Sequence, residues 1–370
     1  MGTLRFLLAL SVVFFHTTPL FGFPALNGFV AVNAFFIISG FYMSLILNEK
    51  YIKKSGSYFL FITNRILRIY PLYLITLFAI FFFSLIKFSM GLHGPENFYY
   101  RFFIFFSHTP GNVIPLNILP DFLNYIIRNI TLVFTTDWFF LTSKNPSTLI
   151  LYQAWSLQRE MFFYLLAPFF ARRNFKVLLL IFVAYIILFF YWVDPHNILP
   201  KNLLLYNCLG TMFFFFLGMF SYKAYVFLRK KTIPPFVIYL TFLGVIIYTV
   251  FYTFIPQIFH LGINLPTDIN YCLIIAIAIP FLFMFGQKLP IDKLLGDLSY
   301  PIFITHVFFI KVLDNIPGIP QGNAIFTLLT TGCSLVASWI FVKFVDRRIN
   351  EFRQKRVKKV ASSSSIIQKA

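Results

Sequence analysis

Long apolar stretches that recur along the chain constrain its fold more than any other feature of the sequence. Each has roughly 17 to 25 residues, the length at which an α-helix crosses about 30 Å of hydrocarbon. Lipid offers the backbone no hydrogen-bond partners, and runs this long and continuous favour helices over barrel strands. The sequence therefore predicts an all-α polytopic membrane protein with about ten transmembrane helices. We expect spans near residues 4–20, 29–47, 66–86, 149–170, 177–193, 203–222, 234–254, 270–286, 301–313 and 324–345.

Basic residues outnumber acidic ones, with 31 Lys and Arg against 12 Asp and Glu and a formal net charge of +19. In a soluble domain this excess would suggest a nucleic-acid partner. Here, most basic residues fall on one side of the membrane when the amino terminus is placed in the cytoplasm. We therefore expect both termini to be cytoplasmic and no nucleic acid as a partner.

Two regions depart from the pattern of clean spans. Residues 87–148 are aromatic and apolar, but prolines and charges interrupt them, which favours re-entrant or interfacial elements on the outer face. Two additional crossings there would preserve the orientation, so a count of twelve stays open. After an integral-membrane domain of residues 1–346, residues 347–370 form a basic cytoplasmic tail. We expect its part 347–359 to be a helix on anionic lipid and Ser362–Ser365 to be disordered.

Ionisable side chains inside the spans are candidates for function because lipid makes them costly. His16, Glu160 and His306 are such residues. Arg5 lies eleven residues before His16, so both share one helix face, about 16 Å apart along the axis. This places His16 near the bilayer centre, where an imidazole could act as general base or hydrogen-bond a neighbouring helix. A lone Glu160 needs a partner, for which we expect His16 or an arginine of another helix.

Two further pairs suggest a substrate site. Arg65 and Arg68 share a helix face and can hold one anion, although arginines at a membrane border also extend to the interface without any ligand. Ser39 and Gly40 lie in a segment of small residues, which predicts close helix packing and could leave room for a slender substrate arm. The three cysteines lie far apart in apolar segments without metal-ligand spacing, so we expect no metal.

Five sequence elements in order together resemble the acyltransferase-3 family of integral-membrane O-acyltransferases. They are LRFLLALSVVFFH with Arg5 and His16, FFIISGF with Ser39 and Gly40, RILR with Arg65 and Arg68, WSLQREMFFYLLAP with Trp155 and Glu160, and LGDLSYPIFITH with Ser299, Tyr300 and His306. The segment before His16 lacks the Asp-Gly-Leu-Arg opening of many members, so the alignment there rests on Arg5 and His16. The chain resembles the standalone form, without a fused extracytoplasmic domain.

The resemblance implies an acyltransferase that moves an acyl group from acyl-CoA, expected to be acetyl-CoA, to a hydroxyl of a cell-surface glycan such as lipopolysaccharide O-antigen or a lipid-linked saccharide. It implies phosphate binding by Arg65 and Arg68 with help from Arg5, and a thioester near Ser39 and Gly40. His16 would act as general base or nucleophile, with Glu160 orienting an imidazole. Further candidate site residues are Trp155, Ser299, Tyr300 and His306.

Two other function classes compete with this interpretation. A transporter or flippase of lipid-linked saccharides would also explain many helices with intramembrane charges. Such transporters usually contain repeated halves, and the sequence has no internal repeat that we can detect. A non-catalytic subunit that binds a partner through the basic tail is the second competitor.

Overall fold

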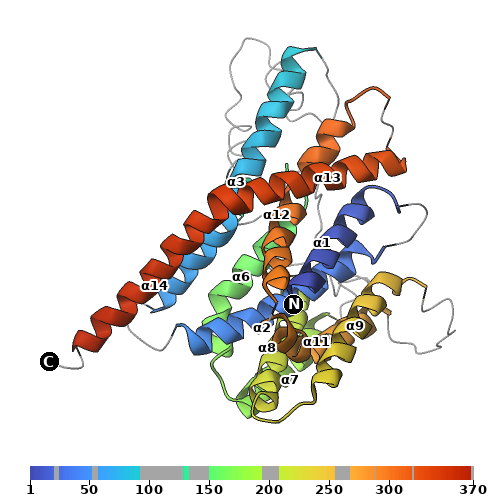
Figure 1. The fold of residues 1–370 in the computed structure, drawn as a ribbon. Coiled ribbons are helices and arrows are strands. Elements are labelled where there is room, and N and C mark those ends of the chain that lie inside the picture. Colours follow the sequence, from blue (N-terminus) through green and yellow to red (C-terminus); the bar gives the residue numbers. More distant parts are fainter. Residues whose placement is uncertain are drawn as a thin grey trace.

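The computed structural model describes residues 1–20, 25–51, 57–91, 127, 129–132, 150–193, 208–254, 267–287, 289–318 and 321–367. Nearly all regular structure in these ranges is helical (Figure 1), which confirms the predicted all-α class. The elements are α1 (Gly2–His16), α2 (Gly28–Glu49), α3 (Ser57–Ser89), α6 (Ala154–Phe170), α7 (Phe175–Val193), α8 (Cys208–Leu228), α9 (Pro235–Phe251), α11 (Thr267–Gly286), α12 (Pro290–Leu313), α13 (Ala324–Phe341), η3 (Val342–Asp346) and α14 (Arg347–Ile367).

Each of the ten predicted spans overlaps one of these helices. In the described part of the chain, six helical segments are long and apolar enough to cross a membrane. The number of crossings and the cytoplasmic placement of the termini stay predictions. The bounds differ most at α12, which begins at Pro290 rather than near residue 301 because it keeps Pro301 in its interior. The predicted re-entrant region, 87–148, lies mainly outside the described residues.

The amino-terminal end of α1 is held by α12. The Asp292 carboxylate accepts hydrogen bonds from the backbone nitrogens of Gly2 and Thr3 at 2.8 Å each, and from the Thr3 hydroxyl at 2.9 Å. The first N–H groups of a helix have no hydrogen-bond partner within the helix, and a carboxylate at this end also interacts favourably with the helix dipole. Asp292 therefore caps α1 from a second helix, and this contact fixes the position of Arg5 one turn further on.

Helices α2 and α8 approach each other closely through two glycines. A Cβ atom added to Gly40 would lie 2.2 Å from the carbonyl oxygen of Phe215, and one added to Gly218 would lie 2.0 Å from that of Ile37. Small residues allow helix backbones in membranes to approach in this way. Gly40 thus packs on α8, as its size predicts, and its neighbour Ser39 points to a different side of α2, toward α6.

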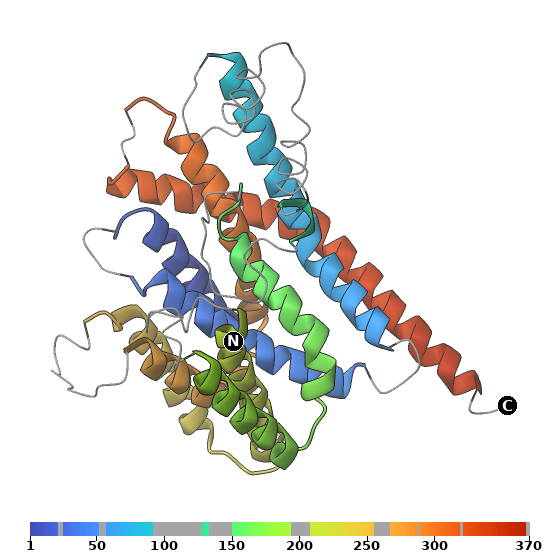
Figure 2. The same cartoon turned by 180° about the vertical axis from the view of Figure 1, so that it is seen from behind.

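Helix α14 continues from α13 through the π-helical turn η3 and lies alongside α3, as Figures 1 and 2 both show. The Arg356 guanidinium joins the two helices by donating to Oδ1 of Asn64 at 3.0 Å and to Oγ1 of Thr63 at 2.9 Å. The helix continues through Ser362–Ser365, for which the sequence predicted disorder. The basic tail is therefore a packed helix over most of its length, and one of its faces contacts the rest of the protein.

Candidate functional site

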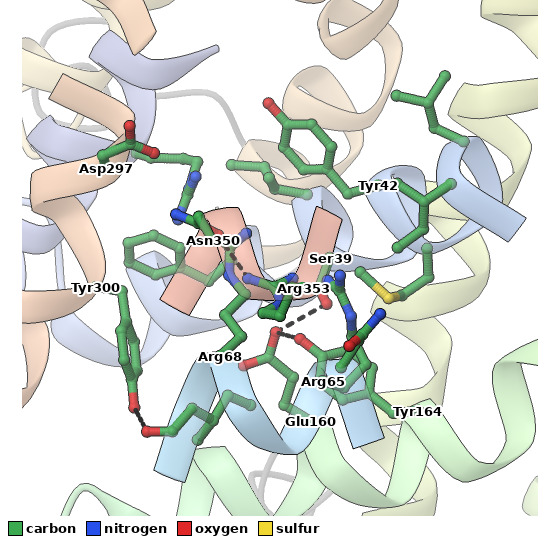
Figure 3. A pocket seen from close by; sticks show the side chains of 18 of the residues that line it. Ser39, Tyr42, Arg65, Arg68, Glu160, Tyr164, Asp297, Tyr300, Asn350 and Arg353 are labelled. Carbon is green, nitrogen blue, oxygen red and sulfur yellow. Dashed lines mark hydrogen bonds between the residues drawn. The ribbon is translucent and has the colours of Figure 1, made fainter. Parts of the chain in front are cut away.

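A cavity of about 800 Å³ lies among α1, α2, α3, α6, α12 and α14 (Figure 3). Its volume is in the upper part of the range that small-molecule and cofactor sites occupy, about 300–1,000 Å³. Seven cationic side chains line it against three carboxylates, namely Arg5, Lys50, Arg65, Arg68, Lys293, Arg353 and Lys358 against Glu49, Glu160 and Asp297. This excess of positive charge favours a ligand with several negative charges.

The sequence-predicted arginines converge on this cavity from two helices. Arg65 and Arg68 come from one face of α3, and Arg5 comes from α1. Arg65 is only 6% exposed, and its Nε atom has no hydrogen-bond partner among the described residues. Within the same part of the chain, Arg5 and Arg68 have no carboxylate within ion-pair distance. Buried donors without partners are rare in proteins, and an arginine fork matches the oxygen atoms of a phosphate or carboxylate.

The carboxylate of Glu160 faces the same cavity from α6. It accepts hydrogen bonds from the Ser39 hydroxyl at 2.9 Å and from the Tyr164 hydroxyl one turn along its own helix. The expected hydrogen bond between Glu160 and an imidazole is not part of this arrangement. The reason is geometric, because Glu160 faces the cavity beside Arg68, whereas His16 is the last residue of α1, about 16 Å along the helix axis from Arg5.

A second cluster brings His16 and His306 together. Their rings are stacked, with centroids 5.5 Å apart and planes 17° from parallel, and the Tyr152 ring meets His16 edge-on at 4.8 Å. His306 is fully buried, and its Nδ1 lies 3.3 Å from the carbonyl oxygen of Ile302. A carbonyl only accepts, so this bond places the proton on Nδ1 and leaves Nε2 as an acceptor. That Nε2 is buried without a partner among the described residues.

The histidine pair lies just beyond the apolar wall of the cavity. Phe303 lines the cavity, and its ring centroid is 6.2 Å from that of His306, which is about one turn further along α12. Phe35 lines the cavity as well, 6.1 Å from Phe303. Helix α1 also extends from the cavity to the histidine pair, with Arg5 lining the cavity and His16 at the carboxy-terminal end of the helix. The arrangement joins a cationic cavity to a pair of imidazoles through an aromatic boundary.

The remaining sequence candidates take different places. Tyr300 lines the cavity, and its hydroxyl donates to the carbonyl oxygen of Ile69 at 2.8 Å. Ser299 is buried and donates to the carbonyl oxygen of Gly296 at 2.7 Å. Trp155 lies under the Arg159 guanidinium, 4.4 Å from its ring centroid. Ser299 and Trp155, like Gly40, belong to the packing around the cavity rather than to its lining.

Sequence reasoning missed several residues of the lining. Tyr164 was detectable, because it lies four residues after Glu160 and so shares its helix face. Arg353 was hidden in a basic run that composition alone assigns to a lipid surface. Groups of three or more His, Cys, Asp or Glu residues suited to a metal ion do not occur in the described part of the chain.

Comparison with known proteins gives one match. A family model described as an acyltransferase domain matches residues 2–343, which is nearly the whole chain and includes the cavity walls from α1 to α12. Helix α14 begins at Arg347, beyond the matched region. No curated protein and no solved structure matches the chain.

Proposed function

The chain belongs to the acyltransferase-3 family of membrane acyltransferases, and we propose that it transfers an acetyl group from acetyl-CoA to a hydroxyl of a cell-surface glycan. The acceptor would be a lipid-linked saccharide or a glycan such as lipopolysaccharide O-antigen, at a bacterial inner membrane. The observation that carries the proposal is the cationic cavity of about 800 Å³, whose aromatic wall at Phe303 is in contact with His306 of the histidine pair. Family membership supports acyl transfer, and the cavity supports a polyanionic acyl donor.

The donor occupies the cavity with its phosphates on the arginines. Arg65 and Arg68 offer adjacent guanidinium forks on one face of α3, and Arg5 adds a third charge from α1. These forks suit phosphate oxygens, and the unpartnered Arg65 Nε supports a ligand at this point. The pantetheine arm then extends along Ser39 toward Phe35 and Phe303, with Gly40 behind it as the packing contact that holds α2 in place.

The acetyl group is transferred at the histidine pair. As general base, His16 accepts the proton of the acceptor hydroxyl while that oxygen attacks the thioester carbonyl. The carbon–sulfur bond then breaks, and coenzyme A leaves with the proton that the imidazolium returns. As nucleophile, the same imidazole would carry the acetyl group before the hydroxyl takes it. His16 is half-buried at the end of α1, so an acceptor can approach it from the side opposite to the arginines.

In this proposal Glu160 holds two walls of the donor cavity in place. Its carboxylate ties Ser39 of α2 to Tyr164 of α6, and its charge partly balances the arginines. This contribution differs from the orientation of an imidazole, because the hydrogen bonds of Glu160 go to hydroxyl groups. Tyr300 forms part of the opposite wall of the cavity.

A transfer experiment tests the proposed function. Purified protein in detergent is incubated with acetyl-CoA labelled in the acetyl group and with a saccharide extract of bacterial membranes. The expected result is label in the saccharide fraction that mild base releases, as it does from an ester. Transport of a lipid-linked saccharide in reconstituted vesicles, without release of coenzyme A, would instead support a flippase.

A further inference from the structure

One face of α14 belongs to the cavity. Asn350, Arg353 and Val357 line it, at the spacing that places side chains on one side of a helix. Arg353 is 8% exposed, whereas the side chain of Arg347 on the same helix is 78% exposed. The π-helical turn η3 before α14 has i→i+5 hydrogen bonds and so contains more residues than an α-helical turn. This shifts which side chains of α14 face the rest of the protein. The basic run therefore contains exposed cations such as Arg347 as well as the buried Arg353.

A short chain of hydrogen bonds orients the Arg353 guanidinium. Asn350 donates from Nδ2 to the Asp346 carboxylate at 2.8 Å, and its Oδ1 accepts from Nη1 of Arg353 at 2.7 Å. The Nε atom of Arg353 is buried and has no partner among the described residues. One edge of the guanidinium is therefore held by α14 itself, and another is available to a ligand.

The guanidinium groups of Arg65, Arg68 and Arg353 gather in one part of the cavity (Figure 3). The positive charges of Arg65 and Arg68 repel that of Arg353, whereas the Asp346 carboxylate attracts it. Three like charges in a buried site are unfavourable unless an anion neutralises them. The carboxylate of Glu160 supplies one negative charge, and its Oε1 already accepts two hydrogen bonds. The cluster therefore fits a dianionic group with several acceptor oxygens, which is a phosphate ester.

We propose that Arg353 binds a phosphate group of the acyl donor together with Arg65 and Arg68, so that α14 completes the donor site. The inference rests on the proposed function, because that function supplies a phosphorylated acyl donor. It extends the site beyond the region that the family match covers. Arg356 supports this role, because its hydrogen bonds to Asn64 and Thr63 hold α14 against α3, the helix that carries the other two arginines.

The test compares coenzyme A binding to the full-length wild type, Arg353→Gln, Arg353→Lys and the matched control Arg347→Gln, with the melting temperature of each ligand-free protein. Arg353→Gln should weaken coenzyme A binding about tenfold or more, which is about 1.4 kcal/mol. Its melting temperature should be unchanged or raised, because a repelled charge is lost. The coenzyme A affinity of Arg353→Lys should lie between those of the wild type and Arg353→Gln, since lysine keeps the positive charge but lacks the planar guanidinium. Arg347→Gln should bind like the wild type.

The outcomes separate the inference from the proposed function. If the wild type binds coenzyme A and Arg353→Gln binds it within about twofold, the role of Arg353 is refuted and the donor proposal stands. If Arg353→Gln weakens binding but also lowers the melting temperature, and Arg353→Lys behaves like the wild type, Arg353 is structural and the inference fails. If the wild type itself binds no coenzyme A, the proposed donor is wrong and the inference fails with it.

Discussion

The imidazole rings of His16 and His306 stack with their centroids 5.5 Å apart, although they come from helices near opposite ends of the sequence. The contact depends on α1 lying along α12, and Asp292 fixes this alignment by capping α1. The Nε2 atom of His306 is buried and unpartnered in the described structure. The pair thus combines a half-buried imidazole, which a substrate can reach, with a buried one that can accept a hydrogen bond.

His306 should affect turnover rather than donor binding. The substitution His306→Phe keeps a ring against His16 but removes both nitrogens. We expect kcat for acetyl transfer to fall about tenfold or more, because the buried Nε2 acceptor beside His16 is lost, with KM for acetyl-CoA unchanged. Steady-state kinetics at varied acetyl-CoA concentration measure the two constants. A rise in KM at unchanged kcat would assign His306 to the donor site instead.

The arginines of α3 should determine donor affinity. Arg65→Gln combined with Arg68→Gln removes two guanidinium forks, each worth about tenfold in binding by the usual energy of a charge-assisted hydrogen bond. We expect the apparent affinity for acetyl-CoA to fall accordingly in equilibrium binding. Arg173→Gln is the control, because Arg173 is exposed after α6 and bonds only a local carbonyl in the described structure. Equal affinity in the double variant and the wild type would refute a phosphate site on α3.

The hydroxyl of Tyr164 should stabilise the fold through Glu160. Tyr164→Phe removes one of the two donors to that partly buried carboxylate, and a hydrogen bond to a charged group is worth about 1.5–3 kcal/mol. We expect a lower melting temperature in detergent. Tyr58→Phe is the matched control, since its exposed hydroxyl donates to the carbonyl oxygen of Leu165, and its cost should be within about 0.5 kcal/mol. Equal melting of the two variants would contradict this account of Glu160.

Close packing at Gly40 gives a prediction with an internal control. Gly40→Ala places a methyl group 2.2 Å from the Phe215 carbonyl oxygen, and overpacking of this kind costs about 1–3 kcal/mol. Gly244→Ala in α9 meets no atom within 4 Å and should be neutral or stabilising by up to about 1 kcal/mol. Thermal unfolding of both variants in the same detergent measures the difference. Similar melting temperatures for the two variants would show that α2 and α8 are packed less closely at Gly40 than in the structure.

Much of the fold was predictable because the length of each apolar run indicates a helix long enough to cross the membrane. Every predicted span overlaps a helix, since a lipid-crossing segment has few other ways to satisfy its backbone. The predicted helix bounds were wrong at the start of α12 and in the carboxy-terminal part of α14. The span expected near 301–313 is part of a longer helix, because α12 begins at Pro290 and contains Pro301 in its interior. Ser362–Ser365 suggested disorder, yet α14 continues through them.

The site was predictable only in part, because a single sequence gives the face of each helix but not the neighbour that the face meets. The structure brings Arg5, Arg65 and Arg68, which the sequence analysis grouped, to one cavity. For Glu160 we expected His16 or an arginine of another helix as the partner; its carboxylate lies in the cavity beside Arg68 and accepts hydrogen bonds from Ser39 and Tyr164. Arg353 could not be separated from the exposed cations around it until α14 was seen against α3.

The most direct test of the central claim is to measure acetyl transfer and coenzyme A binding on the same preparation of His16→Gln and wild type. If His16 carries out the chemistry next to a separate donor cavity, transfer should fall about 100-fold or more, as expected for loss of a general base, while coenzyme A affinity stays within about twofold. Transfer above about a tenth of the wild-type rate would remove His16 from the reaction. A parallel loss of binding would contradict the separation of the cavity from the histidine pair.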